Sequence, residues 1–266
     1  MGRLIYTILL VTSSLLCNAS DSTKLLVAGD FKNFYVDNFK NIYTISYQNQ
    51  LKKLNANGDS ISVFNDTRRY GAIFSVDITN PLKIYIHYAD YNTVLVLDRF
   101  LHITNTLNFN QLQLYQISNI AMSYDGNMWI YDQLNAKVKK LDELGNILLS
   151  TADARLAIGK NFSLQNIIDY NGKLHLYDST SGFYLFDYYG GLIKKVPVPH
   201  WQDVAITDNT LMGRKKNEWL STSYDGLVEK VLYTFTNNKH YKKIVYCGSY
   251  FLALSNMGIE KIYIPK

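Results

Sequence analysis

Three side chains with acid–base chemistry lie beside aromatic residues late in the chain: His200, Asp203 and His240. His200 directly precedes Trp201, His240 directly precedes Tyr241, and Asp203 follows the first of these pairs. Imidazole and carboxylate groups are common general acids and bases in enzymes. These three residues are therefore the first candidates for a hydrolase or lyase. A Ser/His/Asp triad also stays open, although the chain has no Gly-x-Ser-x-Gly nucleophile motif.

The histidines do not form a metal-binding pattern. None of them belongs to the i, i+4 or other close pair that a zinc site uses. The chain also lacks a glycine-rich loop for holding phosphate groups. We therefore expect no metal and no cofactor. The histidines are His87, His102, His175, His200 and His240.

The elements that must position these side chains are clearest in residues 120–149. Short runs of alternating apolar residues are separated there by Asp-Gly and Gly-Asn steps, which favour hairpins because they tolerate positive φ. The stretch predicts a four-stranded antiparallel meander. Its strands are Ile120–Tyr124, Met128–Tyr131, Val138–Leu141 and Ile147–Leu149, with turns at Asp125-Gly126-Asn127 and Asp142–Gly145.

The same pattern recurs about every 40 residues, which is a spacing typical of repeat architectures. Each copy begins with an apolar residue, two polar or small residues and then an alternating strand. The six beginnings are Phe31-Lys32-Asn33-Phe34, Tyr70-Gly71-Ala72-Ile73, Ile117-Ser118-Asn119-Ile120, Leu164-Gln165-Asn166-Ile167, Trp201-Gln202-Asp203-Val204 and Tyr241-Lys242-Lys243-Ile244.

These repeats predict an all-β protein, a six-bladed β-propeller with four-stranded antiparallel blades. The last repeat is one strand short, and an unassigned strand at Lys24–Ala28 precedes the first repeat. A ring explains both facts, because the N-terminal strand then completes the last blade and no open sheet edge remains. We expect residues 20–266 to form this single domain, since no linker divides them.

The third repeat resembles the NHL repeat of six-bladed propellers. The resemblance lies in Asp125-Gly126-Asn127, in Trp129-Ile130 after it, and in Lys140-Leu141-Asp142 followed by Gly145-Asn146. As architecture it extends over Phe31–Lys266. The fifth repeat departs most, because no glycine stands in the turn after Thr207.

Among six-bladed propellers, metal-dependent hydrolases and lactonases place Glu, Asn and Asp at the channel-facing starts of strands. Here only one of the corresponding positions is acidic, and a lysine would repel a cation. The resemblance therefore implies a polar ring at the channel mouth without a catalytic metal. The alternative is that these side chains satisfy backbone groups where each inner strand begins. The positions are Asn33, Ala72, Asn119, Asn166, Asp203 and Lys243.

The N-terminus predicts export. Arg3 is followed by the apolar run Leu4–Leu16, which is short for a membrane span but typical of a secretory signal peptide at residues 1–19, with cleavage after Ala19. A second interpretation makes Cys17 a lipidated residue and thus a lipid anchor. Either places the protein in the periplasm, at the outer membrane or outside the cell. No other apolar run is long enough for a transmembrane segment.

Charge argues against nucleic acid as a ligand. The formal net charge is only +5, with 27 basic and 22 acidic residues. The basic residues occur as scattered pairs, which are typical of solvated strand faces rather than of a nucleic-acid footprint.

The sequence thus predicts an exported, non-catalytic binding or scaffold propeller that contacts an envelope or extracellular partner protein. The alternatives are a hydrolase or lyase with its site at the channel mouth, and a glycan-binding propeller. The expected binding residues at the mouth are Asn33, Asn119, Asn166, His200, Asp203, His240 and Lys243. Arg68-Arg69-Tyr70 and Tyr188-Tyr189 are candidate contact loops, because aromatic side chains bury much area at low entropic cost.

Overall fold

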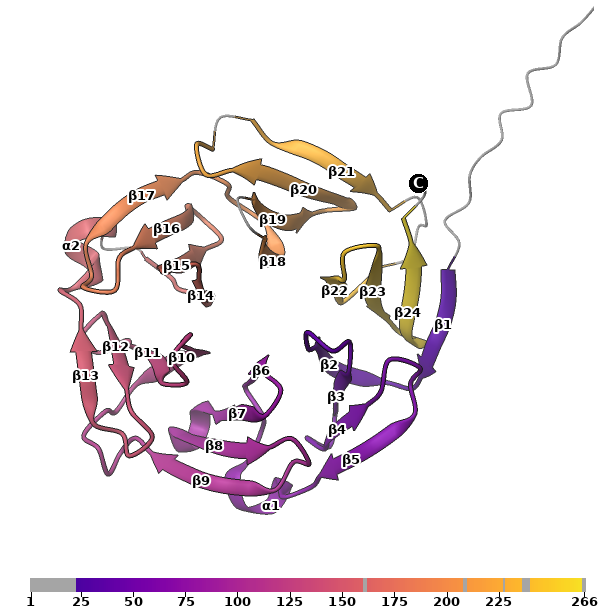
Figure 1. The fold of residues 1–266 in the computed structure, drawn as a ribbon, viewed down its shortest axis with the longest axis horizontal. Coiled ribbons are helices and arrows are strands. Elements are labelled where there is room, and N and C mark those ends of the chain that lie inside the picture. The colour runs from indigo at the N-terminus through magenta and orange to yellow at the C-terminus, as the bar shows by residue number, and fades with distance from the viewer. Residues whose placement is uncertain (1–22, 160–161, 208–209, 227, 236–239, 265–266) are drawn as a thin grey trace, which may run out of the picture.

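The computed structural model describes residues 23–159, 162–207, 210–226, 228–235 and 240–264. They form six four-stranded antiparallel sheets, arranged as blades around a common centre (Figure 1). The first strand of each blade lies nearest the centre and the last lies outermost. The predicted six-bladed propeller is therefore confirmed. The predicted signal peptide, including Cys17, lies outside the described residues.

Blades 1 to 3 follow the chain order. Blade 1 contains β2 (Phe31–Val36), β3 (Ile42–Ser46), β4 (Leu51–Leu54) and β5 (Ser60–Phe64). Blade 2 contains β6 (Ser75–Asn80), β7 (Lys83–Tyr88), β8 (Thr93–Asp98) and β9 (Ile103–Asn108). Blade 3 contains β10 (Ile117–Met122), β11 (Met128–Asp132), β12 (Lys137–Leu141) and β13 (Ile147–Ser150).

Blades 4 and 5 continue this order, and blade 6 takes its outer strand from the N-terminus. Blade 4 contains β14 (Asn166–Tyr170), β15 (Lys173–Asp178), β16 (Gly182–Phe186) and β17 (Leu192–Val196). Blade 5 contains β18 (Gln202–Thr207), β19 (Thr210–Lys215), β20 (Glu218–Ser223) and β21 (Lys230–Thr234). Blade 6 contains β22 (Lys243–Tyr246), β23 (Tyr250–Ser255), β24 (Gly258–Tyr263) and β1 (Thr23–Ala28). The short helices are α1 (Thr67–Tyr70), η1 (Ala89–Tyr91) and α2 (Ala154–Ile158).

The ring closes where β1 pairs antiparallel with β24. Val27 lies opposite Ile259, and Ala28 lies opposite Gly258. Gly258 adopts φ +136, and a Cβ there would lie 2.0 Å from the carbonyl oxygen of Val27. Only glycine therefore fits this close approach of the two strands.

The core lies between blades rather than within one sheet. Ile45 of β3 and Ile86 of β7 share one buried cluster, and Val96 of β8 and Ile130 of β11 share the next. Middle strands such as β11 and β16 are buried throughout, whereas outer strands are largely exposed. Stacking of neighbouring sheets thus provides the apolar burial that stabilises the ring.

The predicted beginning of the second blade was wrong. Tyr70 ends helix α1, and β6 begins only at Ser75. The Tyr70 ring is buried against Tyr88, with ring centroids 5.4 Å apart, so burial holds the segment as a helix before the chain turns at Gly71. The blade-2 residues at the channel are therefore 75–79, and Ala72 is not among them.

Among the described residues, no helix is both long enough and apolar enough to cross a membrane.

Candidate functional site

A cavity of about 710 Å³ lies at the centre of the ring, lined by residues of all six inner strands. These strands are β2, β6, β10, β14, β18 and β22, so each blade contributes to one shared site. Five of the sequence-predicted binding residues line this cavity. They are Asn33, Asn119, Asn166, Asp203 and Lys243.

Asn33 and Tyr35 connect the first blade to the second. The Nδ2 of Asn33 donates to the Tyr35 hydroxyl at 3.2 Å, and that hydroxyl also accepts from the backbone N–H of Val76 at 3.2 Å. Burial raises the pKa of Tyr35 to about 12. The Tyr35 hydroxyl therefore stays neutral over the physiological pH range and acts as a fixed dipole.

Asn119 connects the third blade to the fourth, because its Nδ2 donates to the carbonyl oxygen of Gln165 at 2.9 Å. Its Oδ1 accepts from the Ser118 hydroxyl at 2.8 Å. Asn166 differs: its side chain is exposed to the cavity and makes no hydrogen bond with the described residues. Of the three amide positions, Asn33 and Asn119 are thus hydrogen-bonded within the protein, and Asn166 is available.

The Asp203 carboxylate accepts hydrogen bonds from within the protein. Its Oδ2 accepts from Nε of Arg214 at 2.7 Å and from the backbone N–H of Ile244 at 3.0 Å. Both side chains of the ion pair are about nine-tenths buried, with 10% and 11% of their surfaces exposed. Asp203 also adopts φ +52, an uncommon backbone conformation for a residue other than glycine. The carboxylate therefore joins blades 5 and 6.

Lys243 is the cation of the cavity. Its Nζ lies 3.8 Å from the centroid of the Tyr35 ring and 6.0 Å from that of Phe34. Burial lowers the pKa of Lys243 to about 8, although the nearby Asp203 carboxylate opposes this shift. Among the described residues, Nζ has neither a hydrogen-bond acceptor nor an ion-pair partner. Lys243 is therefore a half-buried cation whose N–H donors face the cavity without protein acceptors.

His200 and His240 line a different cavity, of about 580 Å³, between blades 5 and 6. Lys216 and the buried rings of Phe235 and Tyr241 line the same cavity. Arg214 also lines this second cavity, and its Nε donates to the Asp203 carboxylate. The three acid–base candidates therefore do not meet at one point, and no described contact joins Asp203 to either histidine.

The predicted contact loop is the short helix α1. Tyr70 is buried, and Arg69 lies against it with its guanidinium carbon 5.4 Å from the ring centroid. The side chain of Arg68 lies outside the described part of the chain. Of the described side chains in this loop, only Arg69 is exposed to solvent.

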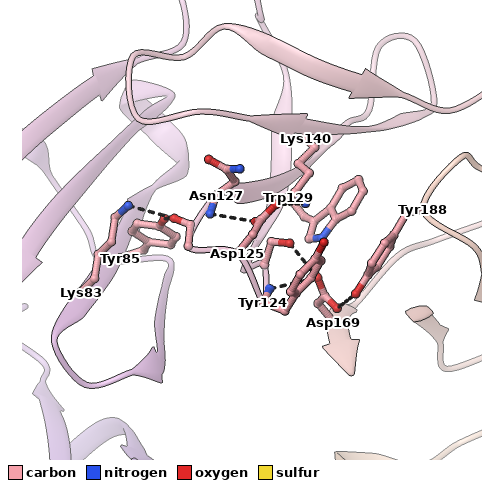
Figure 2. A network of polar contacts seen from close by, with 11 residues as sticks. Lys83, Tyr85, Tyr124, Asp125, Asn127, Trp129, Lys140, Asp169 and Tyr188 are labelled. Carbon is pink, nitrogen blue, oxygen red and sulfur yellow. Dashed lines mark hydrogen bonds and ion pairs between the residues drawn. The ribbon is translucent and has the colours of Figure 1, made fainter. Parts of the chain in front are cut away.

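Sequence reasoning missed a polar network between blades 3 and 4, centred on Asp169 (Figure 2). The Asp169 carboxylate accepts from the Ser123 hydroxyl at 2.8 Å, from Nε1 of Trp129 at 2.8 Å and from the Tyr188 hydroxyl at 2.6 Å. The backbone N–H of Tyr124 adds a fourth contact at 3.3 Å. The one available signal was the aspartate at the end of the fourth inner strand, just before the Tyr170-Asn171-Gly172 turn.

Lys140 lies within the aromatic part of this network. Its Nζ pairs with Asp125 and is 4.9, 5.2 and 5.5 Å from the ring centroids of Tyr124, Trp129 and Tyr188. The Tyr124 and Tyr188 rings stack, with centroids 5.4 Å apart and planes 7° apart. A lysine thus fills the aromatic cage that two adjacent blades form.

No group of three or more His, Cys, Asp and Glu side chains within the described residues is arranged to hold a metal ion.

Neither a family model nor a curated protein sequence matches the chain. Solved structures do. A streptogramin B lyase is 12% identical with a TM-score of 0.60, covering 87% of this chain and 78% of its own. A catalytically inactive virginiamycin B lyase from Staphylococcus aureus with quinupristin is 13% identical with a TM-score of 0.59, covering 87% and 80%.

An extracellular domain from B. thetaiotaomicron, in a protein assigned to the hybrid two-component systems, is also similar. It is 11% identical with a TM-score of 0.57, and the match covers 89% of this chain and 35% of that one. At such identities the likeness shows a shared propeller fold and nothing about shared chemistry.

Proposed function

We propose that this chain is an exported binding propeller that docks a partner protein of the envelope or extracellular space. The observation that carries the proposal is a row of exposed apolar side chains over blades 2 to 4, which we call the turn stripe: Leu82, Tyr124, Leu144 and Tyr189. Their exposed fractions are 62%, 74%, 76% and 87%. Contiguous exposed apolar surface on a soluble protein typically marks an interaction site.

The turn stripe lies on one face of the ring. Its residues occupy turns that join the first to the second strand, or the third to the fourth strand, of a blade. In an antiparallel meander these turns share one edge of the sheet. Contacts of neighbouring residues place these turns close together: the Tyr188 ring, next to Tyr189, stacks on Tyr124, and Lys83, next to Leu82, pairs with Glu143, next to Leu144, at 2.5 Å.

A groove extends this surface between blades 2 and 3. Leu82 and Leu144 flank a cavity of about 500 Å³ whose other apolar lining includes Tyr85, Leu107 and Met128. A partner that inserts an apolar side chain there would bury it against Met128 and Leu107. Anchoring of this kind, with aromatic residues nearby, is how protein interfaces concentrate their binding energy.

The N-terminal sequence supports export, because Arg3 and the run Leu4–Leu16 have the composition of a signal peptide. The intact mass of the protein, purified from the organism that makes it, tests this part. Cleavage after Ala19 predicts the mass of a chain that begins at Ser20. The mass of a chain that carries a diacylglycerol on Cys17 would indicate a lipid anchor. The mass of the whole chain from Met1 would refute export.

Site-specific photo-crosslinking tests the docking surface. A photoreactive residue at Tyr189 should give one discrete adduct in the native organism, and the same residue at Leu156 should not. Leu156 is a matched control because it is 85% exposed but lies in helix α2, on the opposite face. Adding Leu144→Asp should abolish the Tyr189 adduct. Equal adducts from both positions, or none from either, would refute the proposal.

The enzyme alternative has less support, because Arg214 rather than histidine holds Asp203. A glycan-binding role has no specific observation in its favour.

A further inference from the structure

The carboxylates of the central cavity are already engaged. Asp37 accepts from the backbone N–H and the Nδ2 of Asn41, each at 2.8 Å. Asp77 accepts from the backbone N–H of Met122 at 2.7 Å. Asp203 is paired with a guanidinium group, as described above. Each acidic group that lines the cavity therefore already has donors from the protein itself.

The groups that remain available are of the opposite kind. Among the described residues, the side chains of Asn166 and Ser75 make no hydrogen bond, and the contacts of the Lys243 ammonium are with the faces of the Tyr35 and Phe34 rings. A cation over an aromatic face is held in place electrostatically but keeps its N–H donors. The aspartates keep their negative charge, so the complement to an anion is local: the Lys243 ammonium and the neutral polar side chains that remain available.

We propose that the central cavity binds a compact ligand bearing an oxyanion, a carboxylate or a phosphate, with Lys243 as its ionic anchor. This site is distinct from the turn stripe and does not depend on the proposed docking function. Its volume, about 710 Å³, lies within the range of small-molecule pockets. Charge-assisted hydrogen bonds from an ammonium group are stronger than neutral ones, so Lys243 should dominate recognition.

Ionisation of Lys243 gives the site a characteristic pH dependence. Burial lowers the pKa of this ammonium group to about 8, so it is mostly charged at pH 7 and mostly neutral at pH 9. Affinity for an anion should accordingly fall about tenfold between these two values. The other ionisable groups around the cavity, from each element packed against it, are Tyr35, Asp37, Asp77, Asp203, Arg214 and Tyr246. The aspartates stay engaged, and Tyr35, with a pKa of about 12, stays neutral across this range.

Isothermal titration of the purified full chain with inorganic phosphate, citrate and glucuronate tests the proposal. At least one probe should bind with a 1:1 stoichiometry and a Kd below about 1 mM. Lys243→Met should weaken that binding at least tenfold, whereas Lys243→Arg should retain it because the charge remains. Lys242→Met is the matched control, since this neighbouring lysine contacts Asp30 and Tyr47 instead.

The three variants must keep the far-UV spectrum of the parent chain, which separates lost binding from lost folding. Citrate suits the pH series because its carboxylates stay ionised from pH 7 to 9. The proposal is overturned if none of the three probes binds, if Lys243→Met binds as tightly as the parent, or if the affinity is unchanged at pH 9. None of these results bears on the turn stripe, so the two proposals fail independently.

Discussion

Asp169→Ala should be among the most destabilising single substitutions in this chain. The carboxylate accepts from the side chains of Ser123, Trp129 and Tyr188 and from the backbone of Tyr124 (Figure 2). The indole of Trp129 is fully buried, and Asp169 is the acceptor of its N–H. The substitution leaves donors from two adjacent blades without a partner.

The expected magnitude follows from these contacts. A hydrogen bond to a charged group contributes about 1.5–3 kcal/mol, and a buried donor left unsatisfied costs about 1–3 kcal/mol. Because Asp169 is only partly buried, its contacts with Ser123 and the backbone of Tyr124 should lie at the low end. We therefore expect the free energy of unfolding to fall by about 3–5 kcal/mol, or the Tm by about 10 °C.

Urea unfolding followed by tryptophan fluorescence measures this loss. Asp90→Ala is the matched control, because Asp90 is exposed and makes no side-chain hydrogen bond within the described residues, and it should change stability by less than about 0.5 kcal/mol. Tyr188→Phe, which removes a single donor to Asp169, should cost about 1–2 kcal/mol. A loss below about 1 kcal/mol for Asp169→Ala would show that the network does not hold blades 3 and 4 together.

Three further substitutions probe the ring. Burial lowers the pKa of His87 to about 4, so the wild type should lose about 3 kcal/mol as pH falls from 6.5 to 4, and urea unfolding of His87→Leu should lack this loss. Lys139→Met should cost about 3 kcal/mol at pH 7 by breaking a buried 2.6 Å pair with Asp132. Burial raises the pKa of Asp132, but the hydrogen bond from Lys139 helps to bring that pKa below its usual value. The loss of stability caused by Lys139→Met should therefore shrink below about pH 4, as Asp132 becomes protonated. An equal loss at pH 3 would contradict this reasoning. Gly258→Ala should clash with the carbonyl of Val27, cost about 1–3 kcal/mol and speed amide exchange in β1; unchanged exchange would argue against tight closure.

The fold was predictable because its determinants are local. The Asp-Gly-Asn turn at residues 125–127 and the alternation around Trp129 specify hairpins within one blade. Repetition of this pattern along the chain specifies the other blades. Blade 2 shows the limit of this reasoning. Tyr70 matches the repeat pattern, but its ring packs against Tyr88, and a tertiary contact of that kind leaves no trace in a local pattern.

Which inner-strand residues line the central cavity was predictable, whereas their contacts were not, and their role in binding stays a prediction. Asn33 and Lys243 were placed at the channel from the repeat register, and both line the cavity. The same register grouped His200 with Asp203, yet their side chains face different cavities. His200 and Asp203 both adopt positive φ, and the strand register shifts between Gln202 and Ala205, so the usual alternation of side chains fails there.

Polar groups on the inner strands join neighbouring blades, which explains why these positions are polar at all. Tyr35 accepts from blade 2, Asp77 from blade 3 and Asp203 from blade 6, while Asn119 donates to the residue just before β14.

Between blades 6 and 1, by contrast, the Lys243 ammonium lies over the Tyr35 ring. The four junctions named above use their donors and acceptors in hydrogen bonds, whereas a cation–π contact leaves the N–H donors unused. The contact that joins blades 6 and 1 therefore leaves the N–H donors of Lys243 available in the cavity. Lys243 can thus join two blades and also anchor a ligand.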